Sequence, residues 1–279
     1  MEIKSIGVVG AGKMGSGIAL SAAASGFDVM VHEKTQEDLA RGVASMEAQL
    51  GRLVEKGALT REDGSAVRKR IGTTTAFQGF EGLDLAIEAI PESLSLKTPL
   101  LADLDRVCRS DAILATNTST LSITALAAST KRPARFVGMH FFIPPTRLVE
   151  IVRGYYTSDE TVRETTAVAQ RMGRVTVEVT KDSPGFIANR IYTPLLLEAF
   201  RAYEEGLASK EDIDLALKNS YLPIGPFELA DIIGLDVLDG GFDYYESQLG
   251  PTWKPPQSFR RLIRAGRLGK KVGKGWYDY

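Results

Sequence analysis

Cysteine and histidine are scarce in this 279-residue chain, which contains one cysteine, Cys108, and two histidines, His32 and His140. A single cysteine cannot form a disulfide within the chain, and no group of Cys and His has the spacing of metal ligands. We therefore expect no metal centre and, as a default, a reducing cytoplasmic location.

The sequence also lacks an excess of charge and a long apolar run. Its 34 Lys and Arg side chains balance 35 Asp and Glu, for a net charge of -1, which argues against a nucleic-acid-binding surface. No apolar run approaches the length of a membrane span, and the N-terminus shows no cleavable signal. We therefore expect neither nucleic acid nor membrane as a partner, and the length suits two domains or one large one.

What the sequence does contain is a glycine-rich motif directly after a short apolar stretch. Residues 6–9 are typical of a buried strand, and after the glycines the chain continues as a small-residue helix that ends at Gly26. A strand, Gly-x-Gly-x-x-Gly and a helix together predict a dinucleotide-binding turn. The first glycine permits a tight turn, the second lets a pyrophosphate approach, and the third lets helix and strand pack closely. The candidate phosphate-binding residues are Gly10, Gly12, Lys13, Met14 and Gly15.

Glu33 closes a second apolar strand, residues 28–33, at the expected distance beyond the glycines. A carboxylate at this strand end can accept both ribose hydroxyls of an adenosine, and it would repel a 2′-phosphate. The sequence therefore predicts NAD(H) rather than NADP(H) as the cofactor. The alternative is a solvated acid at the strand end that binds no ligand.

Short apolar strands continue to alternate with helical patterns as far as residue 182. Because parallel neighbours need a crossover helix, this alternation predicts a parallel, doubly wound α/β sheet of the Rossmann type. The further expected strands are residues 83–90, 112–116, 135–142, 149–152 and 175–179, and the expected helices are residues 37–56, 61–70, 118–128 and one that begins after residues 91–97 and runs to 104.

Beyond residue 182 the sequence is helical and has almost no strand signal. We therefore predict an NAD-binding domain over residues 1–182 and an all-helical substrate and dimerisation domain over residues 183–279. The apolar faces of its helices need cover, from one another or from a partner subunit. Expected helices span residues 186–205, 229–245 and 258–265, with Gly206 as a C-cap and residues 209–212 opening a further helix.

Of the two histidines, His140 is the candidate acid/base. It ends a strand, and in an open α/β sheet ligands bind beyond the carboxyl ends of the strands. Imidazole titrates near neutral pH, so it can take a hydroxyl proton as hydride leaves the same carbon. Glu150 begins the next apolar strand and could hold the second ring nitrogen, which would fix the tautomer and favour imidazolium. A lone histidine beside prolines is otherwise structural, as we expect His32 to be.

These motifs resemble those of the L-3-hydroxyacyl-CoA dehydrogenases, in particular the short bacterial 3-hydroxybutyryl-CoA dehydrogenases. The resemblance covers nearly the whole chain, and so many motifs in the same order are specific to that family. They lie at residues 10–19, 88–92, 115–119, 138–142, 182–190, 226–236 and 273–277.

Carried over residue by residue, the resemblance implies that His140 is the general base/acid and Glu150 its partner. Ser119 would hydrogen-bond the substrate oxygen, and Asn189 would assist from the start of the second domain. From the residues alone, Ser119 could instead be a helix N-cap and Asn189 a buried helical amide.

Three further residues match positions that the family uses for its ligands. The resemblance implies that Glu92 and Lys97 contact the nicotinamide half of the cofactor. It also implies that Lys56 meets the CoA tail, where a cation suits a phosphate. Without the resemblance, Glu92 could be a surface acid, Lys97 a base on a helix face and Lys56 a solvated lysine. The resemblance thus implies NAD as the cofactor, an acyl-CoA as the small-molecule substrate, and a homodimer.

Two departures from the family pattern fall beside the candidate base. Ile143 stands where the family usually has an asparagine that contacts the cofactor and substrate, and the turn from His140 to Glu150 is shorter than usual. Ile143 cannot donate a hydrogen bond, but it adds apolar surface. We expect these departures to alter the acyl substrate more than the hydride chemistry.

The predicted function is NAD-dependent oxidation of an L-3-hydroxyacyl-CoA, such as 3-hydroxybutyryl-CoA, to the 3-oxoacyl-CoA, or the reverse. Such a reaction belongs to fatty-acid or butanoate metabolism. One alternative is a dehydrogenase of a free 3-hydroxy acid, with which CoA would neither bind nor compete. The other is a catalytically silent dinucleotide-binding protein, which any turnover would exclude.

Overall fold

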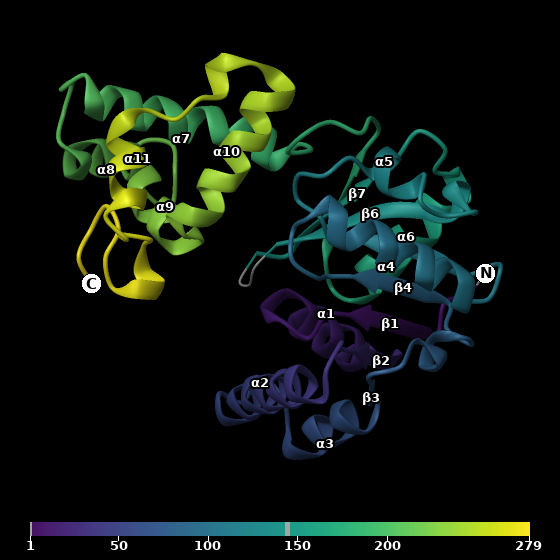
Figure 1. Cartoon of the computed structure of the whole chain (residues 1–279). Coiled ribbons are helices and arrows are strands. Elements are labelled where there is room, and N and C mark those ends of the chain that lie inside the picture. Colours follow the sequence, from purple (N-terminus) through teal and green to yellow (C-terminus); the bar gives the residue numbers. More distant parts are fainter. Residues whose placement is uncertain (1, 143–145) are drawn as a thin grey trace. The chain divides into compact units, whose positions relative to one another are not determined.

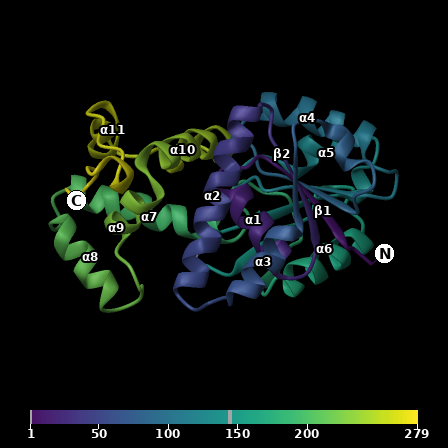
Figure 2. The same cartoon turned by 90° about the horizontal axis from the view of Figure 1, so that it is seen from below.

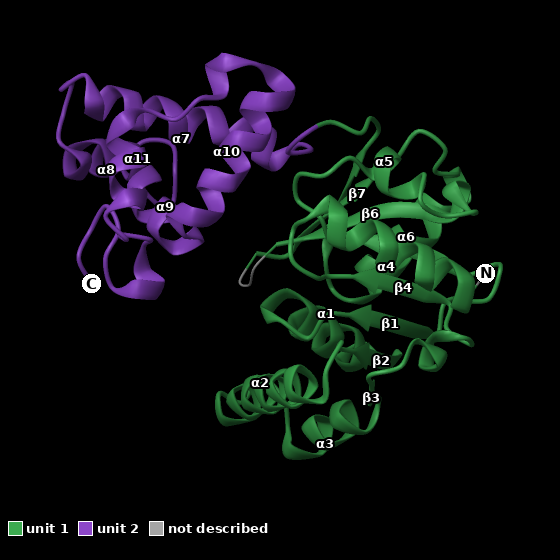
Figure 3. Ribbon diagram, in the orientation of Figure 1, with its two compact units in different colours: residues 1–183 green, residues 184–279 purple. Residues whose placement is uncertain are grey.

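The chain folds into two compact units, each with its own apolar core. The computed structural model describes residues 2–142 and 146–279. The units are Met1–Ser183 and Pro184–Tyr279, shown in different colours in Figure 3. The sequence predicted a boundary at residue 182, close to this division.

An eight-stranded sheet forms the centre of the first unit (Figure 1). Its order is β3-β2-β1-β4-β5-β6-β7-β8, and the strands from β3 to β6 run parallel, as in a Rossmann fold. The chain therefore changes direction across the sheet at β1, where nucleotides bind in this type of fold. The strands are β1 (Ser5–Val9), β2 (Asp28–His32), β3 (Ile71–Thr74), β4 (Leu85–Glu88), β5 (Ile113–Thr116), β6 (Phe136–Phe141), β7 (Leu148–Val152) and β8 (Val175–Val179).

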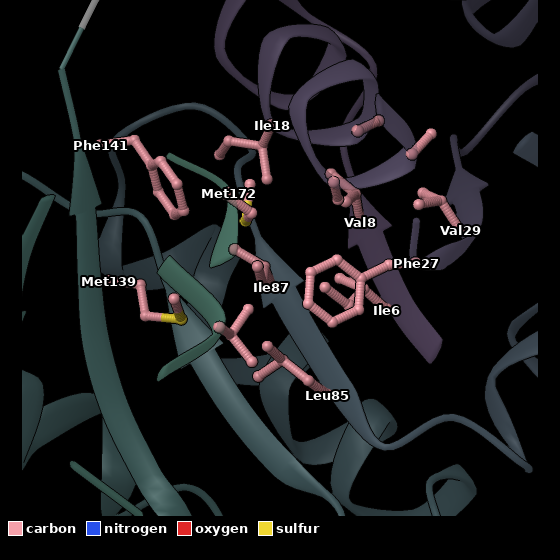
Figure 4. Packing of buried hydrophobic residues seen from close by; sticks show 14 of the residues in the cluster. Ile6, Val8, Ile18, Phe27, Val29, Leu85, Ile87, Met139, Phe141 and Met172 are labelled. Carbon is pink, nitrogen blue, oxygen red and sulfur yellow. The ribbon is translucent and has the colours of Figure 1, made fainter. Parts of the chain in front are cut away.

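Helices cover both faces of this sheet, which is why its central strands are apolar on both sides. Ile18 of the first helix and Met172 just beyond the sixth pack into one core with strand residues such as Val8 and Ile87 (Figure 4). The fourth and fifth helices lie on the other side of the strands (Figure 2). The helices are α1 (Lys13–Ala24), α2 (Gln36–Glu55), α3 (Arg61–Lys69), α4 (Leu94–Val107), α5 (Ile123–Ala127) and α6 (Asp159–Arg171).

Two strands differ from the sequence prediction. β7 runs antiparallel to β6, whereas the sequence predicted a parallel sheet. The connection explains this, because residues 142–147 can join antiparallel neighbours but a parallel pair needs a crossover of a dozen residues or more. β3 was missed because its sequence, Ile-Gly-Thr-Thr, is short and mostly polar, and only Ile71 is buried.

The helix predicted over residues 118–128 is wrong, because α5 is limited to its last part. The backbone N–H groups of residues 119–120 donate instead to the carboxylate of Glu92. The helix begins only after Ser122, whose hydroxyl caps its first turn. A distant acid thus competes with the helix for these N–H groups, and the local sequence does not reveal that competition.

The second unit is built from helices around an aromatic core. Phe200 is fully buried, and its ring lies 5.3, 5.5 and 5.0 Å from those of Phe227, Phe259 and Trp276. Aromatic rings at such distances add an attraction to the area that they bury. The helices are α7 (Ala188–Glu204), α8 (Lys210–Lys218), α9 (Pro226–Ile233), α10 (Leu235–Leu249) and α11 (Gln257–Arg264).

Local capping sets the helix boundaries in this unit. Gly206 has a φ of +75° just after α7, and the Ser209 hydroxyl caps α8 by accepting the Asp212 N–H, both as predicted. The helix predicted over residues 229–245 is instead two helices, α9 and α10. They are separated at Gly234, whose φ of +105° is a conformation that only glycine adopts at little cost.

Candidate active site

The turn between β1 and α1 has the geometry that a dinucleotide requires. Gly10 has a φ of +98°, and a Cβ there would lie 2.8 Å from the Ala89 carbonyl oxygen. A Cβ on Gly15 would lie 1.8 Å from the Gly10 carbonyl oxygen, so only glycine lets α1 pack this closely. A Cβ on Gly12 would meet no atom within 4 Å, which leaves open space at the turn. Each glycine thus satisfies a different requirement.

The N-terminus of α1 begins at this turn. Gly12 is the N-cap, and no side chain in the described part of the chain caps the helix, so its first N–H groups can bind an anion. The positive end of the helix dipole adds to this attraction. Lys13 is exposed and Met14 is half-buried beside these groups. The residues present therefore fit the pyrophosphate of a dinucleotide.

Glu33 follows β2 and lies against the glycine turn. Its Oε1 accepts the Ala11 N–H at 2.6 Å, and its Oε2 accepts the Lys34 N–H at 3.2 Å. The half-buried carboxylate is therefore at the strand end where a ribose acid is expected. His32 has a different environment, since its ring stacks on Phe77 at 4.2 Å and burial lowers its pKa. A buried, stacked imidazole of this kind fits a structural role.

His140 and Glu150 form a buried pair across β6 and β7. They lie opposite each other in the antiparallel register, with His140 Nδ1 2.7 Å from Glu150 Oε2. Their exposed fractions are 5% and 0%. An ionised carboxylate can only accept, so Nδ1 donates and Nε2 is the nitrogen that could exchange a proton. The Phe142 ring lies beside the imidazole, 4.4 Å away between centroids.

The end of β5 lies next to this pair. Thr116 ends β5 beside β6, and the Asn117 amide oxygen accepts the Phe141 N–H at 2.8 Å. Ser119 follows two residues later, so it leaves the sheet at the same edge as His140. It is half-buried, and its hydroxyl makes no hydrogen bond to another residue in the described ranges. Sequence reasoning missed Asn117, although it stands directly after a predicted strand.

Glu92 contacts the turn after β5, and Lys97 lies beside Glu92. Glu92 Oε1 accepts the N–H groups of Ser119 and Thr120 at 3.0 and 3.1 Å. Lys97 is 1% exposed, and its ammonium lies 2.5 Å from Glu88 Oε1 and 3.4 Å from Glu92 Oε2. Lys97 is thus a buried ion-pair partner. Sequence reasoning also missed Glu88, whose signal was an acid inside an otherwise apolar strand.

Two other predicted site residues lie elsewhere in the chain. Lys56 is exposed and follows α2 as its C-cap. Asn189 is half-buried in the first turn of α7, in the second unit. Ile143 lies outside the described residues, so the effect of its turn on the substrate stays a prediction.

Other kinds of site find little support in the described residues. They contain no group of His, Cys, Asp and Glu that could hold a metal ion, and none of their helices is long and apolar enough to cross a membrane. Cys108 is buried, and burial raises the pKa of its thiol to about 11. The thiol is therefore protonated and a poor nucleophile at neutral pH.

Two family models match consecutive parts of the chain. Residues 5–183 match the NAD-binding domain of 3-hydroxyacyl-CoA dehydrogenase, and residues 185–279 match its C-terminal domain. The chain belongs to the 3-hydroxyacyl-CoA dehydrogenase family. It is an NAD-dependent oxidoreductase, and the cofactor predicted from the sequence is confirmed.

Individual members of this family align with the chain over nearly its full length. A probable 3-hydroxybutyryl-CoA dehydrogenase of Deinococcus radiodurans is 45% identical over 277 residues, covering 98% of this chain and 99% of the relative. A protein of the same description from Bacillus subtilis is 44% identical over 283 residues, covering 100% of this chain and 98% of the relative. The crystal structure of (S)-3-hydroxybutyryl-CoA dehydrogenase from Ralstonia eutropha matches with a TM-score of 0.95 and 40% sequence identity. The match covers 100% of this chain and 99% of that one. The resemblance read from the motifs is therefore confirmed.

We expect Gly15→Ala to weaken NADH binding by about tenfold or more, equivalent to about 1.4 kcal/mol. The new methyl group would collide with the Gly10 carbonyl oxygen and displace the turn. The control is Gly51→Ala, also within a helix, where a Cβ meets no atom within 4 Å. Fluorescence titration with NADH measures the dissociation constant of each variant. Equal dissociation constants for Gly15→Ala and wild type would show that the close packing is not needed for binding.

A second prediction concerns cofactor choice. We expect kcat/KM for NADH to exceed that for NADPH by about tenfold or more, because a 2′-phosphate would meet the like charge of Glu33. Glu33→Ala should narrow this ratio, whereas Glu37→Ala, at an exposed acid of α2, should not. Steady-state kinetics with both cofactors gives the ratio. Equal use of the two by the wild type contradicts the assignment of Glu33.

Proposed function

We propose that this chain interconverts an L-3-hydroxyacyl-CoA and the 3-oxoacyl-CoA with NAD, and that 3-hydroxybutyryl-CoA is a substrate. The names of its full-length relatives support the substrate class. The observation that carries the proposal is the buried His140–Glu150 pair at the edge of the sheet that also carries the dinucleotide turn. That pair supplies what such a reaction needs beyond the cofactor, namely a proton acceptor held in one orientation.

In the oxidation direction His140 is the general base. Glu150 holds Nδ1–H, so the lone pair of the neutral ring is on Nε2, which takes the proton of the substrate hydroxyl. Bound NAD supplies the acceptor of the hydride that leaves the same carbon. The imidazolium that forms is stabilised by the Glu150 charge at 2.7 Å, and it returns the proton in the reverse direction.

Ser119 and Asn189 are proposed to polarise the substrate oxygen. The support for Ser119 is its place after β5, at the same sheet edge as His140, and a hydroxyl that makes no bond to another described residue. The support for Asn189 is family resemblance alone. Hydrogen bonds to an oxygen that gains charge in the transition state lower the barrier more than they aid substrate binding.

The cofactor-binding residues follow from the turn and its neighbours. Gly10, Gly12, Lys13, Met14 and Gly15 would hold the pyrophosphate, and Glu33 the adenosine ribose. Glu92 and Lys97 would lie toward the nicotinamide half, a role that their ties to the turn of residues 118–120 support. Lys56 would meet a phosphate of the CoA tail, since it is an exposed cation.

We propose a different role for each of the two units. The first would bind NAD, and the second would complete the substrate site and form a homodimer. Large apolar side chains that are more than half exposed on the second unit support a partner surface there. They are Ile191, Leu207, Leu215, Tyr221, Val237 and Tyr279.

His140→Ala should lower kcat by roughly 10²–10⁴ while NADH still binds, because the proton acceptor is lost and the cofactor turn is untouched. Glu150→Gln should also lower kcat, since the amide lacks the charge that stabilises imidazolium. Glu164→Gln is the control, because Glu164 is also an acid of low exposure, 9%, and pairs with Arg135 from helix α6. A near-normal kcat for His140→Ala, with chemistry shown to be rate-limiting, would refute the assignment.

The substrate class is tested by following NADH absorbance with acetoacetyl-CoA, longer 3-oxoacyl-CoAs and free 3-oxo acids side by side. We expect turnover of the CoA esters and competitive inhibition by free CoA, since the tail contributes binding energy apart from the reacting carbon. Turnover of the free acids without inhibition by CoA would replace the proposal with a dehydrogenase of free hydroxy acids.

A further inference from the structure

Glu88 is a fully buried acid that the reaction proposed above does not use. It ends β4, and both of its carboxylate oxygens are engaged inside the first unit. Oε1 accepts the Ile90 N–H at 2.7 Å and the Lys97 ammonium at 2.5 Å, while Oε2 accepts the Thr116 hydroxyl at 2.6 Å. The acid therefore joins the ends of β4 and β5 to helix α4.

Lys97 connects this acid to a second one. Its ammonium donates to Glu88 and to the Ile90 carbonyl oxygen at 3.2 Å, and it lies 3.4 Å from Glu92 Oε2. Two carboxylates thus share one cation, and the cation is 1% exposed. Buried ion pairs are often no better than apolar packing at stabilising a fold, and in some proteins they serve to select one arrangement of the groups that they join.

Glu92 connects this ion pair to the turn after β5. One oxygen, Oε1, accepts the N–H groups of Ser119 and Thr120 and the hydroxyls of Thr118 and Thr120. Burial alone would raise the pKa of this carboxyl, but Lys97 and these hydrogen bonds hold it below its usual value. The turn is therefore anchored to an ionised carboxylate that is itself held by Lys97.

The same turn is fixed on its other side to the strand of the proposed base. The Asn117 amide oxygen accepts the N–H of Phe141, the residue after His140. Ser119 thus lies between two attachments, one to β6 and one to Glu92. A shift of either attachment would move the Ser119 hydroxyl relative to the imidazole.

We propose that Glu88 is a positioning residue, which acts through Lys97 and Glu92 to hold the Ser119 hydroxyl in register with His140. This inference rests on the proposed contact between Ser119 and the substrate oxygen. Glu88 itself would touch neither substrate nor cofactor. Misplacement of a reacting group by about 1 Å can cost about 100-fold in rate, so a loss of this network has a measurable effect on kcat.

Thr116→Val is the mildest test, because it removes the hydroxyl that holds Glu88 and keeps the size and shape of a buried strand residue. We expect it and Glu88→Gln to lower kcat by about tenfold or more, measured at saturating NADH because Lys97 and Glu92 are also proposed cofactor contacts. Thr116→Ser, which restores the hydroxyl, should recover most of the loss. Thr165→Val is the control, since Thr165 is equally buried but bonds only carbonyl oxygens within α6.

The deciding measurement is a double-mutant cycle with Ser119→Ala, in which kcat is measured for the single and double variants. If Glu88 and Thr116 act through Ser119, then Thr116→Val and Glu88→Gln should cost less than about twofold once Ser119 is alanine. Full additivity would overturn the positioning role and leave the proposed role of Ser119 intact. A Ser119→Ala variant with unchanged kcat would instead refute the role of Ser119 itself, and the inference with it.

Discussion

The site depends on one constraint of parallel sheets, which is that the carboxyl ends of all the strands meet at the same edge. In this chain β1, β2, β4, β5 and β6 are parallel neighbours, so Gly10, Glu33, Glu88, Asn117 and His140 reach that edge from distant parts of the sequence. The one antiparallel neighbour has a separate effect. Because β7 returns directly beside β6, Glu150 lies opposite His140 without any crossover. The parallel strands bring together the proposed nucleotide-binding residues, and the antiparallel β7 adds Glu150 to the proposed acid/base pair.

Carboxylates at this edge act mainly by holding other groups in place. Glu33 binds the N–H of the glycine turn, Glu92 binds the turn after β5, and Glu150 binds the imidazole. Of these three acids Glu150 is fully buried, and an acid buried without donors would be strongly unfavourable, so its position is compatible only with a specific set of partners. The same pairing gives each partner a fixed orientation. Precise geometry at the site is therefore a consequence of the hydrogen bonds that these carboxylates accept.

Much of this arrangement could be predicted from the sequence, because its signals are local. The glycine spacing, the strand-end Glu33 and the sequence around His140 each identify a position at or just beyond the end of a strand, and the confirmed fold class follows from their order. Glu88 and Lys97 could not be recognised as a pair, since their partnership depends on how β4, β5 and α4 pack. The helix predicted over residues 118–128 failed for a related reason, because a distant carboxylate takes the N–H groups that a helix would use.

The central claim is that Glu150 holds the Nδ1 proton of His140 and leaves Nε2 to exchange one with the substrate. Imidazole ¹⁵N NMR tests this directly, because the chain has only two histidines and His32→Asn identifies the other. In the neutral ring of His140 the account predicts a protonated Nδ1 and an unprotonated Nε2, with the Nδ1–H signal altered by Glu150→Gln. A neutral His140 that carries its proton on Nε2 in the wild type would contradict it.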